Sequence, residues 1–200
     1  DIKKVKDEYH AICRKYADAR AHKFVEFDLL RVLEEMIETR GADRSKAPYL
    51  AREFRLLSRH KLRLFQCVVE ILSGLKERGA GVYLVSNAQA CFTKDELGEL
   101  GISHLFDGIL ISSDAGVKKP CTEIFDIAFD KFSLDKNECV YVGNDLHDDV
   151  LGAHNAGLKT VYIETEQSGK YPNLNTVPDY EVKTHEEMKE LLFSLTVTND

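Results

Sequence analysis

Several features that would define a function class are missing from this sequence. No run approaches the roughly 20 consecutive apolar residues that a helix needs to cross a bilayer, so we expect no membrane partner. Long tracts of lysine and arginine are also missing, and the formal net charge is −7. This argues against nucleic acid as a partner, because its phosphates must be neutralised along the backbone. A small phosphorylated substrate stays compatible, because a local positive pocket can form on an acidic protein.

Closely spaced cysteine pairs are missing too. The cysteines are odd in number, lie far apart and include no Cys-x-x-Cys motif; they are Cys13, Cys67, Cys91, Cys121 and Cys139. Zinc sites and disulfide frameworks use closer or even-numbered sets. The pattern therefore favours reduced thiols, and we expect a cytoplasmic protein.

The first third of the sequence has helical periodicity. Apolar residues recur every three or four positions through residues 1–66, with no convincing strand. We predict a small all-helical domain over residues 1–66.

The pattern changes over residues 67–200, where helical stretches alternate with short apolar runs. These runs are 81–87, 108–113, 139–143, 159–163 and, more weakly, 179–182. Near-continuous apolar strands separated by helices are typical of a parallel sheet with helices on both faces. Thr93 with Glu96, and Thr184 with Glu187, have the spacing of helix-starting capping boxes, and 166–178 is predicted to be a surface loop. The fold class is therefore α/β and Rossmann-like, with residues 67–200 as the core domain.

Polar side chains follow successive strands of this predicted sheet. Ser86 and Asn87 end the first run, Lys119 follows the second, and Asp145 and Asp149 follow the third. Each is ordinary alone, because serine is common in turns and acids often cap helices. Ligands bind at the carboxyl ends of parallel strands, so their joint occurrence there indicates one site.

The residue types at this edge suit phosphoryl transfer. Ser86 and nearby backbone N–H groups can hold phosphate oxygens, and Lys119 can offset negative charge in the transition state. Carboxylates would repel a phosphate unless they hold a hard cation. Mg²⁺ prefers oxygen ligands, so we expect it as the cofactor.

Three segments together resemble motifs of the haloacid dehalogenase superfamily. They are "VYLVSNAQ", "GVKKP" and "VYVGNDLHDDVLGAHNAG". The resemblance implies a core over 67–200 and an inserted helical cap over 1–66. It also implies that Ser86 and Lys119, the lysine that directly precedes proline, are catalytic. The same two residues and Asn87 are implied to bind substrate. In the third segment the family usually has Gly-Asp, whereas this chain has Asn144 and then Asp145. Either residue can take the first metal-binding position, with Asp149 as the second acid.

The family's first motif, a strand ending in Asp-x-Asp, is absent from these residues. The nearest stretch is Phe27-Asp28-Leu29-Leu30, where Leu30 stands in place of the second acid, and we predict that Asp28 caps a helix. In the family the first aspartate is the nucleophile, and its strand is central in the sheet. Without that strand, two sheet edges would stay unpaired. We therefore expect the strand upstream of Asp1, and we expect these 200 residues by themselves to be inactive.

The leading prediction is a Mg²⁺-dependent phosphatase that acts on a small phosphorylated metabolite through an aspartyl-phosphate. One alternative is a 2-haloacid dehalogenase, which needs no metal; the acidic third segment argues against it. The other is a catalytically inactive member of the superfamily that acts as a binding or scaffold protein.

Overall fold

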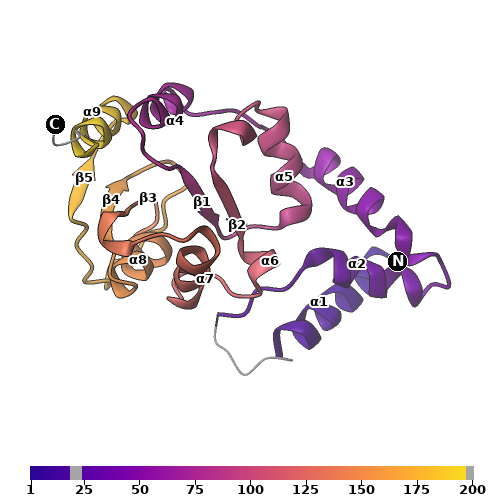
Figure 1. Cartoon of the computed structure of the whole chain (residues 1–200). Helices are drawn as coiled ribbons and strands as arrows, with labels where there is room; N and C mark the ends of the chain where they lie inside the picture. Colours follow the sequence, from indigo (N-terminus) through magenta and orange to yellow (C-terminus); the bar gives the residue numbers. More distant parts are fainter. Residues whose placement is uncertain (19–23, 197–200) are drawn as a thin grey trace. The chain divides into compact units, whose positions relative to one another are not determined.

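The computed structural model describes residues 1–18 and 24–196, in mixed α/β order (Figure 1). The chain forms two compact units. The first consists of Asp1–Arg63, Ser86–Gly101 and Ile111–Lys118, and the second of Leu64–Val85, Ile102–Leu110 and Lys119–Asp200. The predicted domains, residues 1–66 and 67–200, stay a prediction. In the two compact units, Ser86–Gly101 and Ile111–Lys118 are grouped with the helical N-terminal region.

The first unit is built mainly from helices. In the part that the structure describes they are α1 (Ile2–Asp18), α2 (Leu29–Glu38), η1 (Arg44–Lys46), α3 (Ala47–Ser58), α5 (Ala90–Glu99) and α6 (Ser112–Ala115). Ile12 of α1 packs with Leu29, Val32 and Met36 of α2 in one apolar cluster. This cluster buries part of the apolar faces that the helical periodicity predicted for α1 and α2.

Asp28 caps α2, as the sequence predicted. Its side chain accepts a hydrogen bond from the Leu30 N–H at 2.9 Å, which satisfies one of the free donors of the first turn. The segment that imitates the first family motif is thus a helix start.

The second unit holds the strands. Its strands are β1 (Tyr83–Ser86), β2 (Gly108–Ile111), β3 (Val140–Gly143), β4 (Lys159–Ile163) and β5 (Tyr180–Val182). Its helical segments are α4 (Val68–Glu77), η2 (Ser103–Leu105), α7 (Glu123–Phe132), η3 (Lys136–Glu138), the π-helical η4 (Leu146–Leu151), α8 (Gly152–Asn155) and α9 (His185–Leu195). The last residue of β1 and the last residue of β2 are grouped with the first unit. Ile71 of α4, Val161 of β4, Val182 of β5 and Leu192 of α9 share one buried cluster. Sheet and helices therefore cover each other's apolar faces.

The strands form two separate sheets among the described residues. β1 pairs with β2, and β3-β4-β5 form the other sheet, in which both pairings are parallel. The predicted α/β class with parallel strands is confirmed. β1 and β3, which carry the first and third of the three motifs, belong to different sheets.

One predicted helix start is confirmed and the other is wrong. Thr184 caps α9 and accepts a hydrogen bond from the Glu187 N–H at 3.1 Å. Thr93, however, lies inside α5, which already begins at Ala90, and its hydroxyl donates to the Gln89 carbonyl at 3.1 Å. The segment 166–178 contains no helix or strand, as predicted. Among the described residues, no helix combines the length and apolar character that a bilayer span requires.

Candidate active site

Lys119 and Asp149 form a buried ion pair in the second unit. Lys119 Nζ lies 2.6 Å from Asp149 Oδ1, and the side chains are 8% and 9% exposed. Burial alone would lower the pKa of Lys119, but its interactions with Tyr141 and Asp149 outweigh that effect and raise the pKa above the ordinary lysine value. The ammonium is therefore fully charged at neutral pH.

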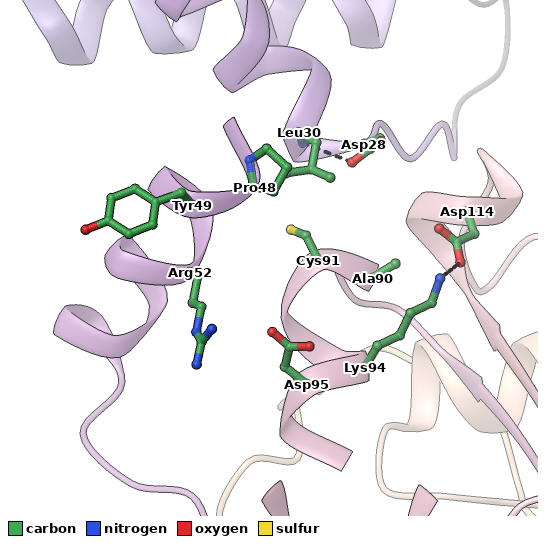
Figure 2. Close-up of a pocket in the computed structure, with 10 residues that line it drawn as sticks. All are labelled: Asp28, Leu30, Pro48, Tyr49, Arg52, Ala90, Cys91, Lys94, Asp95 and Asp114. Atoms are coloured by element: carbon green, nitrogen blue, oxygen red, sulfur yellow. Dashed lines mark hydrogen bonds and ion pairs between the residues drawn. The ribbon is translucent and has the colours of Figure 1, made fainter. Parts of the chain in front are cut away.

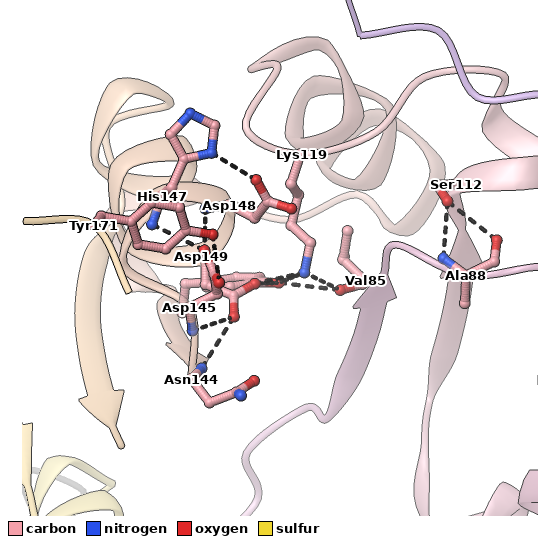
Figure 3. A network of polar contacts seen from close by, with 11 residues as sticks. Val85, Ala88, Ser112, Lys119, Asn144, Asp145, His147, Asp148, Asp149 and Tyr171 are labelled. Carbon is pink, nitrogen blue, oxygen red and sulfur yellow. Dashed lines mark hydrogen bonds and ion pairs between the residues drawn. The ribbon is translucent and has the colours of Figure 1, made fainter. Parts of the chain in front are cut away.

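Two further oxygen atoms contact the same ammonium. Lys119 Nζ donates to Tyr141 Oη at 2.7 Å and to the Val85 carbonyl at 3.2 Å (Figure 3). Tyr141 also donates its own hydroxyl proton to the Val85 carbonyl at 3.0 Å. Val85 is in β1 and Tyr141 in β3, so two side-chain donors bind a carbonyl at the edge of β1.

The second oxygen of Asp149 binds the backbone of the motif loop. Asp149 Oδ2 accepts hydrogen bonds from the N–H groups of Asn144 and Asp145, each at 3.0 Å. This close approach depends on Gly143, because a Cβ there would overlap the Cβ and carboxyl atoms of Asp149. The motif glycine is thus required by packing.

Asp145 is the N-cap of η4. Its Oδ1 accepts from the N–H groups of His147 (2.9 Å) and Asp148 (2.7 Å), and its Oδ2 accepts from Tyr171 Oη (2.8 Å) and the Gly169 N–H (3.3 Å). Burial would raise the pKa of Asp145, but these hydrogen bonds outweigh it and hold the pKa below the usual value. The hydrogen bond between Tyr171 and Asp145 raises the pKa of Tyr171 to about 12.

His147 lies beside this carboxylate. Its Nδ1 is 2.7 Å from Asp148 Oδ1, and its ring stacks on Tyr171 with centroids 5.5 Å apart. Together, Asp145, His147 and Asp148 place one potential metal-binding atom each within 4.8 Å of one another.

The donor set fits Mg²⁺ by type, since it consists of ionised carboxylate and amide oxygens. The hydrogen bonds distinguish the two candidates for the first metal-binding position. Both oxygens of Asp145 already accept two hydrogen bonds each. Asn144 donates its amide to Thr165 Oγ1 at 3.0 Å, and its side-chain oxygen accepts no hydrogen bond from the described residues. The Asn144 side-chain oxygen can therefore approach a cation without dismantling the cap, whereas Asp149, like Asp145, already accepts hydrogen bonds on both oxygens.

Ser86 and Asn87 belong to the first unit. Ser86 is the last residue of β1, and its hydroxyl makes no hydrogen bond to any residue that the structure describes. The loop that follows is held by Ser112 and Ser113, which accept from the N–H groups of Ala88 (2.9 Å) and Ala90 (2.8 Å). The six predicted site residues thus divide between the units, with Lys119, Asn144, Asp145 and Asp149 in the second.

A pocket of about 570 Å³ lies in the first unit (Figure 2). Arg52 and Asp95 line it from α3 and α5, and Lys94 and Asp114 form an ion pair of 2.8 Å at its side. None of the predicted site residues lines this pocket.

The sequence did not identify Tyr141 or Tyr171 as site residues. Tyr141 sits in an apolar strand run, where its ring alone accounts for its presence. Tyr171 sits in a long loop without a motif. The available signal for Tyr141 was a hydroxyl-bearing side chain two residues before the motif glycine, Gly143. No sequence pattern identified Tyr171.

A profile of haloacid dehalogenase-like hydrolases matches residues 2–163. Glyceraldehyde 3-phosphate phosphatase of Methanopyrus kandleri is 33% identical over 139 residues, 67% of this chain and 58% of that protein. Phosphoserine phosphatase of Thermus thermophilus is 29% identical over 134 residues, 67% of this chain and 53% of that protein. The chain thus spans a little over half the length of these relatives.

Among solved structures, 2-haloacid dehalogenase from Pseudomonas syringae pv. Tomato aligns with a TM-score of 0.60 and 27% identity, over 82% of this chain and 69% of that one. The profile match covers most of the chain and includes all six predicted site residues. On this evidence the chain belongs to the haloacid dehalogenase-like hydrolase family.

Proposed function

We propose that the protein is a phosphatase that hydrolyses a small phosphorylated metabolite. The observation that carries this proposal is the buried ammonium of Lys119, held 2.6 Å from Asp149 and fully charged. A fixed positive charge of this kind stabilises the negative charge that develops on a transferring phosphoryl group. Two relatives that are phosphatases of small phosphorylated compounds support it.

The proposed roles follow the family motifs. An aspartate upstream of Asp1 attacks phosphorus, the bond to the leaving-group oxygen breaks, and water then cleaves the aspartyl-phosphate. Ser86 and Asn87 bind the phosphate oxygens, and Lys119 offsets their charge. The division of β1 and β3 into two sheets supports an upstream strand that pairs with both. Residues 1–66 would act as the cap.

Mg²⁺ is the proposed cofactor, and it would offset phosphate charge when bound. Asn144 and Asp149 are the preferred ligands, with Asp145 as the alternative first ligand that would have to exchange hydrogen bonds. The five free thiols support the proposed cytoplasmic location.

A dehalogenase is the second candidate, favoured by the likeness to 2-haloacid dehalogenase. The two activities differ in their need for metal. Hydrolysis of p-nitrophenyl phosphate that stops with a chelator and returns with Mg²⁺ supports the phosphatase. Release of halide from 2-chloropropionate in the presence of chelator supports the dehalogenase instead.

The first experiment is to sequence the coding region across about 30 residues upstream of Asp1, enough for one strand and its loop. The proposal predicts a hydrophobic strand that ends in Asp-x-Asp. A region with no such acid removes the nucleophile and favours the scaffold alternative.

The second experiment replaces Lys119 in the full-length polypeptide. Lys119→Met should lower kcat for p-nitrophenyl phosphate by about 100-fold or more, the scale of losing one electrostatic stabiliser. Lys118→Met is the matched control, because it removes the neighbouring charge and should keep activity within about twofold. Equal activity of both variants would contradict the proposed role of Lys119.

A further inference from the structure

We propose that Tyr141 is a positioning residue that holds the Lys119 ammonium in its working orientation. The inference rests on the proposed phosphatase function and adds a residue to its machinery. Tyr141 would act through Lys119 without touching the substrate.

Three oxygen atoms are among the contacts of Lys119 Nζ. They are Asp149 Oδ1 at 2.6 Å, Tyr141 Oη at 2.7 Å and the Val85 carbonyl at 3.2 Å. An ammonium has three N–H donors and no acceptor. The phenol supplies one of the two short contacts, so it restricts where the flexible lysine side chain can point.

The phenol is itself fixed more firmly than the lysine. Tyr141 lies in β3, where it is paired with Thr160 of β4, and its ring meets Phe125 of α7 edge-on, with centroids 5.2 Å apart at 79°. Its hydroxyl proton goes to the Val85 carbonyl at 3.0 Å, which leaves an oxygen lone pair directed at the ammonium. A lysine side chain has a flexible stem of four carbons, and it loses considerable conformational entropy when its ammonium is held in one place. The tyrosine is therefore the anchor.

The chemical nature of the anchor matters for an anion site. Asp149 is the carboxylate that pairs with Lys119, whereas Tyr141 and Val85 present neutral oxygens. A second carboxylate in place of the phenol would cancel the charge that a phosphate needs. The phenol orients the ammonium and leaves that charge available.

The test compares two tyrosine variants of the full-length polypeptide. Tyr141→Phe keeps the ring and removes the hydroxyl. Tyr162→Phe does the same at a buried position of β4, where the hydroxyl makes no hydrogen bond to the described residues. Both variants should remain folded at the assay temperature, which their thermal midpoints check. With p-nitrophenyl phosphate, Tyr141→Phe should lower kcat about 10- to 100-fold, the effect of losing a hydrogen bond to a charged group, and change KM less than about threefold. Tyr162→Phe should change neither.

A double-mutant cycle separates positioning from a general structural role. In a Lys119→Met background, Tyr141→Phe should lower kcat by less than about twofold, because there is no ammonium left to orient. An equal loss in both backgrounds would overturn the inference, as would full activity of Tyr141→Phe.

Inorganic phosphate affinity, measured by calorimetry, keeps the two proposals distinguishable. If the unaltered polypeptide hydrolyses no phosphomonoester, the proposed function fails. The positioning role would still predict phosphate binding weakened at least about fivefold in Tyr141→Phe and unchanged in Tyr162→Phe. Unchanged binding in both variants would overturn it.

Discussion

At the scale of single residues, the polar side chains of the site make most of their hydrogen bonds with one another and with the nearby backbone. Asp149 accepts hydrogen bonds on both oxygens, from Lys119 on Oδ1 and from two backbone N–H groups on Oδ2. A buried charge is tolerated only when it is paired and hydrogen-bonded. Changes at this point should therefore affect both stability and activity.

Gly143 is the position with the least room. Gly143→Ala should lower the free energy of unfolding by about 1–3 kcal/mol, the usual effect of overpacking, because the new Cβ overlaps Asp149. It should also abolish phosphatase activity, since Asp149 must move. Gly98→Ala is the control: nothing lies within 4 Å of its Cβ, and alanine favours a helix. Urea denaturation of both variants measures the effect, and equal stability would contradict the prediction.

Asn144 allows a test of the metal position. Asn144→Asp should bind Mg²⁺ about 10-fold more tightly, roughly 1.4 kcal/mol, because it adds a charged oxygen ligand next to Asp149. Asn137→Asp, at an exposed position, adds the same net charge elsewhere. Calorimetric titration with Mg²⁺ measures both, and an equal gain in the two variants would count against Asn144.

Asp145 should give a pH-dependent contribution to stability. Its pKa is lower in the folded protein than the unfolded value of about 3.9. Its stabilisation is therefore present above that value and is lost as pH falls through the folded pKa. Without metal, Asp145→Asn should be less stable at pH 7, and the difference from the unaltered protein should shrink below about pH 4. A difference that does not vary with pH in urea denaturation would show that the charge is irrelevant.

At the scale of elements, α3 and α5 are joined by ion pairs. Arg55 lies 2.7 Å from Glu96, and Arg59 lies 2.7 Å from Glu99 and 3.5 Å from Glu96. The Glu96 side chain is only 14% exposed. Solvent therefore screens its charge less than that of an ordinary surface acid. The Phe54 ring of α3 also lies 6.4 Å from the Phe92 ring of α5, between centroids, so charge and aromatic contacts both join the two helices.

Replacing the shared acid tests that contact. Glu96→Gln should lower the free energy of unfolding by about 1 kcal/mol at low salt, and by less in 1 M NaCl, where charges are screened. Glu77→Gln, at an exposed position without an ion pair to the described residues, should be neutral. A Glu96→Gln effect that does not change with salt would show that hydrogen bonding or packing, not charge, dominates.

Element starts were predictable where the cap is local. Thr184 binds Glu187 within its own first turn, so the spacing alone identified the start of α9. α5 starts earlier than its sequence spacing indicated. The preceding Gln89 binds the Leu29 N–H at 2.8 Å and the Phe27 carbonyl at 2.9 Å. These contacts span about 60 positions, and no local pattern encodes them.

At the scale of the whole molecule, the two sheets should differ in protection. β4 has a hydrogen-bonded neighbour on each side, and Val161 and Ile163 are buried. β1 pairs with β2 alone in the described chain. In a polypeptide limited to these 200 residues, we therefore expect amides of β4 to exchange more slowly than those of β1, because opening them requires more of the structure to unfold. Hydrogen exchange read by mass spectrometry or NMR checks this, and faster exchange in β4 would contradict it.

The sequence by itself determined the α/β class, the positions of the strands and the family motifs, because apolar periodicity and strand-end residues are local patterns. It could not determine which side chains those motif residues would bind. Lys119 comes from one motif segment, and Tyr141 and Asp149 come from another. Their contact depends on strand pairing and burial. The hydrogen bond from Tyr171 to Asp145 and the separation of β1 from β3 were likewise decided by tertiary structure, since each depends on partners far away along the chain.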